Sequence, residues 1–227
     1  MKLSDMRRLC LIAAAALLAA CQAQKPRTGD LVFIGIPAEY NAETGSMDEA
    51  IVAATGRGSL NIIHAAILEM APEGPMIIDA TLKYGVDRHP LDSTIAQFTL
   101  GDGSQPVYIV KRLKKGFKPE FIDNAKAFCG RGYDLYFLPE NEELYCTELI
   151  QRSYTAPDGL PIFPSQPMNF KNKDGEFPHY WNWLFGLLGM DIPQGLPGTN
   201  PQDMMDSPAL KTVNVDLLNI PAQARND

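Results

Sequence analysis

Apolar runs separated by short turns occupy the first half of the chain, and they predict the strands of a β-sheet. The predicted strands cover residues 29–36, 60–68, 76–80, 95–100 and 107–113. These runs are rich in β-branched or aromatic residues and are bounded by glycine, proline or polar positions, as buried strands are. The Gly-Asp-Gly-Ser turn between the last two runs predicts that they form a β-hairpin.

Helical spacing of apolar residues predicts four helices. Ser46, with Glu49 three positions later, is a capping-box signature that begins the first helix. Apolar residues within 121–128 fall on one face of a second helix. A third helix is expected from Cys146 onward, and residues 177–190 hold an aromatic-rich fourth.

Cys146 stands at the start of its predicted helix, where a thiol can become a nucleophile. Leu149, Ile150 and Ser153 share one helical face with it, and the polar run 139–143 predicts a loop just before it. A thiol in the first turn of a helix lies near the positive end of the helix dipole and near unpaired N–H groups, which favour the thiolate. A small buried hydrophobic residue is the alternative interpretation, because cysteine is often buried.

The first twenty residues predict an export signal. A basic start precedes the apolar run 11–20, which is too short to span a bilayer as a mature helix. The run ends Leu-Ala-Ala-Cys at Cys21, which resembles the lipobox of bacterial lipoproteins. We therefore expect a signal peptide over residues 1–20, a lipidated Cys21 and a polar tether over residues 21–28. An ordinary secretory signal is the alternative.

Charge and composition restrict the partners of the exported chain. The net charge is −7 for the full sequence and −9 once residues 1–20 are removed, and no basic cluster is present, which argues against binding to nucleic acid or to anionic lipids. Membrane attachment would depend on the lipid at Cys21. Gln22, rather than aspartate, follows this cysteine, which points to an envelope lipoprotein of the outer membrane or cell surface.

Residues 29–227 are expected to form a single domain. Ten of the 18 prolines lie between residues 155 and 227, together with both tryptophans. This composition predicts an irregular C-terminal wrap packed on the core.

Two cysteines remain once the signal is removed and Cys21 is lipidated. A disulfide between Cys129 and Cys146 is an option in an exported protein. Cys129 ends an amphipathic pattern, however, and is therefore expected in the core. The chain has three histidines and no H-x-x-x-H or C-x-x-C pair, so we predict neither a metal site nor a cofactor.

His64 and Asp79 are the polar side chains best placed to act with a thiol, because each interrupts an apolar strand. If their strands are antiparallel neighbours, the two side chains can face each other. Cysteine, histidine and an orienting carboxylate are the components of thiol acyl transfer. A core histidine and a strand-end carboxylate are the alternatives. His89 is expected in a loop and His179 in the aromatic segment, both outside the site.

Six motifs then occur in an order that resembles a known family. They are Gly29-Asp30-Leu31-Val32-Phe33, Ala50-Ile51-x-x-Ala54-Thr55, His64, Ile77-Ile78-Asp79-Ala80 with Gly85-Val86, Tyr133-Asp134-x-x-Phe137 and Tyr145-Cys146-Thr147-Glu148-Leu149. Each is weak alone, but in this order they resemble the YiiX/YebB-like group of permuted, NlpC-type papain-like cysteine hydrolases. The resemblance extends from about Gly29 to Tyr154.

The resemblance implies an α+β, circularly permuted papain-like (NlpC-type) fold, in which an antiparallel sheet packs on the helix that carries the cysteine. The family nucleophile maps to Cys146, its base to His64 and its third polar residue to Asp79, where relatives often have glutamate. Thr147 stands where serine is commoner. Tyr133 matches a tyrosine that can line the site, and a core tyrosine is the alternative.

Three functions remain open. A cysteine peptidase or amidase acting on peptides, including cell-wall stem peptides, is the first, and its substrate comes from the resemblance. A thiol-dependent lipid acyltransferase or thioesterase is the second, because related permuted folds use the same thiol and histidine on acyl lipids. A non-catalytic binding lipoprotein that presents the same cleft is the third. The intact set of Cys146, His64 and Asp79 favours an enzyme.

Overall fold

The computed structural model describes residues 23–40 and 45–220. The predicted signal peptide (1–20) and the predicted lipidation site, Cys21, lie outside the described residues. Within the described ranges, no helix has the length and apolar character needed to cross a membrane.

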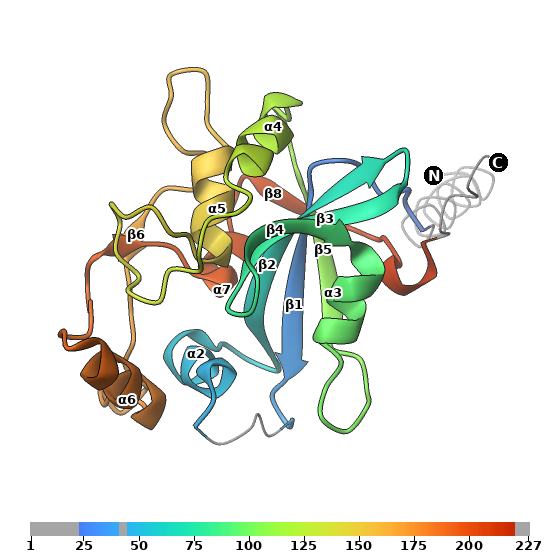
Figure 1. Ribbon diagram of the computed structural model, residues 1–227. Helices are drawn as coiled ribbons and strands as arrows, with labels where there is room; N and C mark the ends of the chain where they lie inside the picture. Colours follow the sequence, from blue (N-terminus) through green and yellow to red (C-terminus); the bar gives the residue numbers. More distant parts are fainter. Residues whose placement is uncertain (1–22, 41–44, 221–227) are drawn as a thin grey trace, which may run out of the picture.

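A six-stranded antiparallel sheet forms the centre of the molecule (Figure 1). Its strands are β1 (Asp30–Pro37), β2 (Leu60–Ala71), β3 (Gly74–Thr81), β4 (Gly85–Pro90), β5 (Val107–Leu113) and β8 (Leu210–Val213). They lie in the order β4-β3-β2-β1-β5-β8, and every neighbouring pair is antiparallel. The chain thus begins in the middle of the sheet and returns to its edge near the C-terminus.

Helices cover both faces of this sheet. The helices are α2 (Met47–Thr55), α3 (Leu91–Gln97), α4 (Glu120–Ala127), α5 (Cys146–Ser153), α6 (His179–Leu188), α7 (Pro201–Met205) and the short 3-10 helix η1 (Leu217–Asn219). Of these, α6 packs on α2 instead of on the sheet. Alternate residues of a strand point to opposite faces, so Leu31 and Phe33 join α4 and α5 in one core, whereas Val32 and Ile34 join α3 and η1 in another. β1 is therefore apolar at nearly every position, as a strand covered on both sides must be. The fold is the α+β class expected from the sequence.

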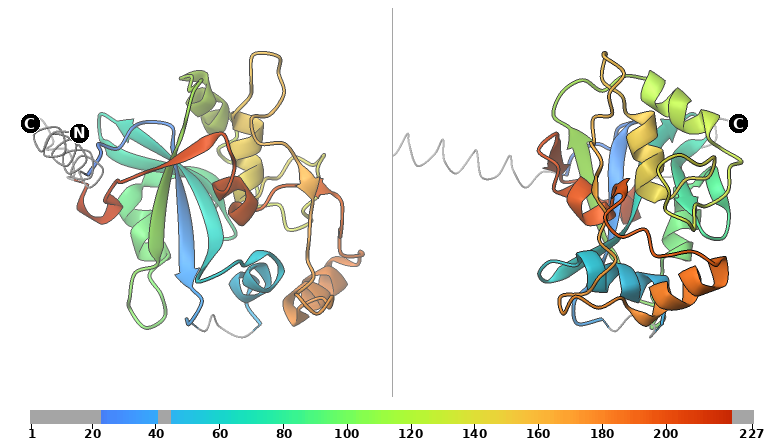
Figure 2. Two further views of the ribbon diagram at one scale, coloured as in Figure 1. Left: turned by 180° about the vertical axis from the view of Figure 1, so that it is seen from behind. Right: turned by 90° about the vertical axis from the view of Figure 1, so that its left-hand side faces the viewer.

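The C-terminal segment is largely irregular and packs against the rest of the molecule. It contains a two-stranded ribbon of β6 (Gln166–Pro167) and β7 (Pro197–Gly198), and α6 lies beside α2 in each view (Figures 1 and 2). Aromatic side chains from this segment and from the loop before α5 form a third apolar cluster. Its large members are Phe137, Tyr145, Phe170, Tyr180, Trp181 and Phe185. This cluster holds the aromatic segment against the start of α5.

The predicted hairpin of residues 95–100 and 107–113 is wrong. The first half of it lies in the helix α3 and the turn after it, while β5 pairs with β1 and β8. Leu91, Ile95 and Phe98 recur at helical spacing and contact the same core, so burial of one helical face overrides the strand-like composition.

Two further expectations also need correction. Cys129 is exposed, because α4 ends at Ala127 and the chain turns toward β4, where Gly130 donates a backbone hydrogen bond to Val86. His89 lies on β4 instead of in a loop, paired with Ile77 of β3.

Candidate active site

α5 places Cys146 at its first position, as the sequence predicts. The preceding residue, Tyr145, is the N-cap and has an extended backbone, so the helix begins at the cysteine itself. Cys146 is 5% exposed, and both it and Cys129 are free thiols, so the disulfide considered from the sequence is absent. The first-turn N–H groups of a helix have no partner within it, which places donors and a positive dipole end beside this thiol.

A β-bulge directs His64 of β2. Ile34 of β1 pairs with His64, whereas the next residue, Gly35, pairs with Ile62, so Ile63 is an extra residue in β2. A bulge of this kind re-aims the neighbouring side chain and is common beside active sites. His64 is 6% exposed, and its ring centroid lies 4.7 Å from that of Phe98. The ring forms a hydrogen bond with Asp79 and is close enough to the Cys146 thiol to interact with it.

Asp79 reaches His64 across the β2–β3 pair. Its Oδ2 lies 2.7 Å from His64 Nε2, and the Asp79 side chain is fully buried. Thus the aspartate side chain is long enough to bond the imidazole even though relatives often carry glutamate. The three residues that sequence analysis assigned to the chemistry are therefore contiguous, in the order thiol, imidazole and carboxylate.

The environment of His64 favours the imidazolium. Burial by itself lowers the pKa of the ring, but hydrogen bonds with Asp79 and Cys146, together with the attraction of these two groups, raise the pKa from 6.5 to about 10. A carboxylate on one side of a histidine and a thiol on the other is the arrangement that stabilises a thiolate–imidazolium pair.

A small apolar pocket of about 50 Å³ opens beside the cysteine. Its lining includes Ile63, Tyr133, Phe137, Cys146, Met168 and Trp181. Tyr133 thus lines the site as well as packing in the core, so both sequence interpretations of it describe the structure. The pocket can accept an apolar group of a substrate next to the thiol.

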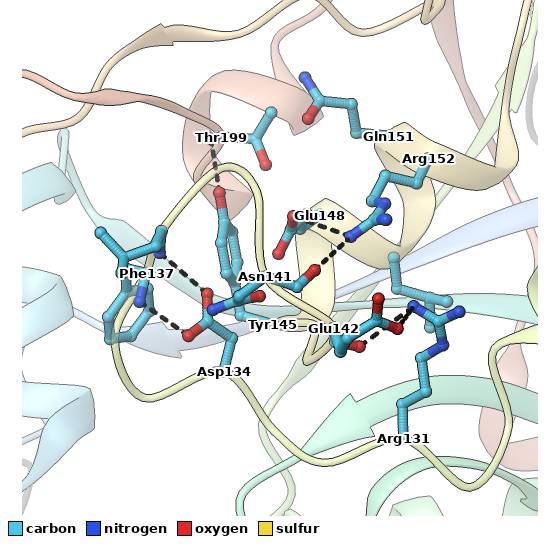
Figure 3. Close-up of polar contacts among 12 residues, drawn as sticks. Arg131, Asp134, Phe137, Asn141, Glu142, Tyr145, Glu148, Gln151, Arg152 and Thr199 are labelled. Carbon is cyan, nitrogen blue, oxygen red and sulfur yellow. Dashed lines mark hydrogen bonds and ion pairs between the residues drawn. The ribbon is translucent and has the colours of Figure 1, made fainter.

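Thr147 and Tyr145 connect α5 to the C-terminal segment. The backbone N–H of Thr199 donates to the Tyr145 hydroxyl at 3.0 Å (Figure 3). Thr147 Oγ1 and Thr199 Oγ1 share a hydrogen bond of 2.9 Å. Sequence analysis identified Thr147 but missed Thr199, because nothing in its local pattern places it beside a helix more than fifty residues earlier.

Two further carboxylates lie near the site: Asp48, which no sequence motif contains, and Asp134, which the sequence names only as part of a family motif. Asp48 lies in the first turn of α2, where burial raises its pKa and the nearby His64 lowers it. Asp134 is buried and accepts backbone N–H groups of the loop that leads to α5, including that of Phe137 at 3.0 Å, a residue with a positive φ of 52° (Figure 3). Asp48 thus places a carboxyl group near His64, and Asp134 fixes the loop that precedes Cys146.

Glu148 lies in the first turn of α5, and its Oε1 is 3.5 Å from Nη1 of Arg152, four residues later on the same helix (Figure 3). Its side chain is 4% exposed. Burial and repulsion by Asp134 raise its pKa from 4.5 to about 7, although Arg152 opposes the shift.

This chain is similar to known proteins over most of its length. Residues 25–214 match the family described as permuted papain-like amidase enzymes, YaeF/YiiX, C92 family. The uncharacterized protein YiiX of Escherichia coli K12 is 27% identical over 197 residues, which cover 84% of this chain and 87% of that protein. The crystal structure of metalloprotein yiiX from Escherichia coli O157:H7 superposes with a TM-score of 0.62 at 25% identity, covering 85% of this chain and 99% of the other. The match to the family model spans most of the sequence, and the chain therefore belongs to the permuted papain-like amidases of the YaeF/YiiX (C92) family.

Proposed function

We propose that this protein is a cysteine amidase that hydrolyses amide bonds of peptides, cell-wall stem peptides among them. Cys146 would be the nucleophile, His64 the acid and base, and Asp79 the residue that orients His64. The observation that carries the proposal is the buried sequence of thiol, imidazole and carboxylate, in which His64 is hydrogen-bonded to Asp79 and interacts with the Cys146 thiol.

The reaction follows from the two nitrogens of His64. Because Nε2 is held by Asp79, Nδ1 is the nitrogen available to the thiol. The Cys146 thiolate attacks the amide carbon and forms a C–S bond, and the proton on Nδ1 then passes to the leaving nitrogen as the C–N bond breaks. In the second half, Nδ1 takes a proton from water, the hydroxide attacks the thioester, and the acid leaves as the thiolate re-forms.

The start of α5 provides for the charge that develops on the carbonyl oxygen. First-turn N–H groups point out of a helix N-terminus, and the Cys146 N–H is the one nearest its own sulfur. Such a donor stabilises a tetrahedral oxyanion, because it is in place before the charge forms.

The apolar pocket favours a second candidate function, thiol-dependent transfer or hydrolysis of a lipid acyl group. Aromatic and aliphatic side chains dominate the lining of the pocket beside Cys146. An acyl chain and an apolar peptide side chain would both fit this chemistry. The two functions differ in the bond that breaks and in the products.

Selective alkylation of Cys146 tests the nucleophile. Iodoacetamide at about pH 6 should label Cys146 faster than Cys129, even though Cys146 is buried and Cys129 exposed, because only Cys146 has an imidazole partner. Burial, with repulsion by Asp87, also raises the pKa of the Cys129 thiol, which makes it a suitable internal control. His64→Ala should remove the difference in alkylation rate between Cys146 and Cys129. Equal labelling of the two cysteines would contradict the assignment.

Product analysis separates the candidate functions. The purified chain is incubated with muropeptides and, separately, with acyl lipids, and the products are identified by mass spectrometry. New amine and acid ends in the muropeptides support the amidase, and an acyl adduct on Cys146 after lipid treatment supports acyl transfer. Rapid alkylation of Cys146 without either product would favour the binding lipoprotein.

We also propose that the mature protein is attached to the cell envelope through a lipid on Cys21. The motif at residues 18–21 motivates this proposal. Mass spectrometry of the N-terminal peptide should find a diacylglyceryl cysteine, and Cys21→Ser should release the protein from membranes. An unmodified N-terminus created by cleavage elsewhere would contradict it.

A further inference from the structure

Asp79 has a second buried oxygen that the bond to His64 does not use. Oδ2 lies 2.7 Å from His64 Nε2, whereas Oδ1 forms no hydrogen bond with any of the described residues. A buried carboxylate oxygen without a donor or cation costs free energy. His89 Nδ1 lies 3.9 Å from this oxygen, beyond hydrogen-bond distance.

Strand pairing brings Asp87 and His89 to the same place. Asp79 of β3 lies directly opposite Asp87 of β4, so alternation along β4 puts Asp87 and His89 on the face that carries Asp79. His89 Nδ1 is 2.9 Å from Asp87 Oδ1. One ligand-type atom from each of the three residues lies within 4.8 Å of the others. Two carboxylates in opposed positions repel each other, and a cation between them would remove that repulsion.

The other nitrogen of His89 is already oriented. Its Nε2 lies 2.8 Å from Oγ1 of Thr94, a fully buried residue of α3. Without an ion, Nδ1–H can donate to Asp87 and Nε2 can accept from this hydroxyl; when an ion displaces the proton, Nε2–H donates instead and the Nδ1 lone pair points toward Asp79 and Asp87. A hydrogen bond from the second nitrogen is the usual way in which a protein fixes a metal-binding histidine.

The cluster adjoins a surface cavity of about 700 Å³. Asp87 and His89 line it, together with Lys83, Ser93 and Gln97. The ammonium group of Lys83 lies 4.8 Å above the Tyr84 ring, which gives this nearby positive charge an aromatic partner. An ion and its water ligands can therefore approach Asp87 and His89 from solvent, whereas Asp79 is fully buried behind them.

We propose that Asp79, Asp87 and His89 bind a divalent ion of the zinc class, through Asp79 Oδ1, one Asp87 oxygen and His89 Nδ1. Two carboxylates and one imidazole suit Zn²⁺ better than Ca²⁺ or Mg²⁺, which prefer oxygen alone. Water from the cavity completes the coordination. Asp79 then serves two partners, with Oδ2 on His64 and Oδ1 on the ion.

This site revises the expectation from the sequence that no metal is bound. That expectation considered closely spaced histidine and cysteine pairs, whereas these ligands are eight and two positions apart on two strands and meet only through the β3–β4 register. The proposal does not depend on the amidase activity, because its ligands require only the fold.

Calorimetric titration with ZnCl₂ tests the site. The parent for this experiment carries Cys129→Ser and Cys146→Ala, because both thiols can bind zinc themselves. We expect one Zn²⁺ per chain in the parent and weaker binding of Ca²⁺. Asp87→Asn and His89→Gln should each weaken zinc binding at least about tenfold, as loss of a ligand does.

Asp92→Asn is the matched control, since Asp92 is an exposed carboxylate at the start of α3 and not a ligand. It should bind zinc as the parent does, and Co²⁺ should give the parent, but not Asp87→Asn, the visible absorption of a coordinated ion. Thermal melts confirm that each variant is folded. If one of the two ligand variants, Asp87→Asn or His89→Gln, does not fold, the other still tests the site. Absence of zinc binding in the parent, or equal affinity in the parent and both ligand variants, would overturn the proposal.

Discussion

Two buried carboxyl groups near Cys146 show how strongly the surroundings of a residue determine its role. Asp79 bonds His64 at 2.7 Å, so its negative charge has a close partner. Glu148 has Arg152 only at 3.5 Å, and one of its oxygens forms no hydrogen bond with the described residues. Burial and Asp134 then raise the pKa of Glu148 to about 7. Asp79 is suited to orient an imidazole, whereas Glu148 is a carboxyl group that the fold prefers neutral.

The raised pKa predicts that Glu148 makes the protein less stable as pH rises. In the unfolded chain the carboxyl has a pKa of about 4.5, and in the folded chain about 7. Below pH 4.5 the Glu148 carboxyl is protonated in both the folded and the unfolded chain, and its burial carries no charge penalty. Between pH 4.5 and about 7 the unfolded chain has lost this proton while the folded chain keeps it, so the free energy of unfolding falls as pH rises. Glu148→Gln should therefore gain stability over the parent as pH rises through this range, by up to about 3 kcal/mol. Urea unfolding at a series of pH values measures the difference.

Glu142→Gln is the control for this titration. Glu142 pairs with Arg131 at 3.1 Å, but its side chain is 93% exposed, so its replacement should change stability by less than about 0.5 kcal/mol at every pH. If Glu148→Gln and the parent show parallel pH profiles, Glu148 does not carry the raised pKa.

At the scale of elements, the sequence predicts those parts whose signal is local. The strands around His64 and Asp79, the capped helix after Ser46 and the helix from Cys146 follow from periodicity and end signals, and the structure contains them. The register shift at Ile63 has no local signature, because it depends on how β1 and β2 align. It is nevertheless the shift that aims His64. The sequence also does not predict that His89 lies near Asp79, because this depends on the β3–β4 register.

The N-cap of α2 offers a direct test of such a local signal. The Ser46 hydroxyl accepts the Glu49 backbone N–H at 3.1 Å, and Glu49 in turn accepts the N–H of Gly45. Ser46→Ala should lower the free energy of unfolding by about 1 kcal/mol, because it leaves a helix N–H without its acceptor. Chemical denaturation measures the change.

Ser93→Ala is the matched control, since Ser93 is an exposed residue within α3 and does not cap it. This change should leave stability within about 0.5 kcal/mol of the parent. Equal losses from the two alanine variants would show that the Ser46 cap does not stabilise α2.

On the scale of the whole molecule, the C-terminal segment completes the site that the first 154 residues begin. It returns to α5 at β7 and the residues after it, where Thr199 bonds both Tyr145 and Thr147, and its aromatic residues pack behind Tyr145. The contact brings the Met168 and Tyr145 side chains close to Gly198, which is buried. A Cβ at this position would lie 2.1 Å from Met168 Sδ and 2.9 Å from the Tyr145 hydroxyl.

Gly198→Ala should therefore displace Met168 and the Tyr145 ring, and with it the N-cap of the helix that begins at Cys146. We expect a loss of about 1–3 kcal/mol in stability, typical of overpacking, and slower alkylation of Cys146 by iodoacetamide in the folded protein. Gly186→Ala supplies the control, because Gly186 lies inside α6 with no atom within 4 Å of a new Cβ. That change should stabilise the protein by about 0.5–1 kcal/mol and leave Cys146 alkylation unchanged. If Gly198→Ala loses stability but Cys146 reacts at the parental rate, the C-terminal segment supports the fold without positioning the nucleophile.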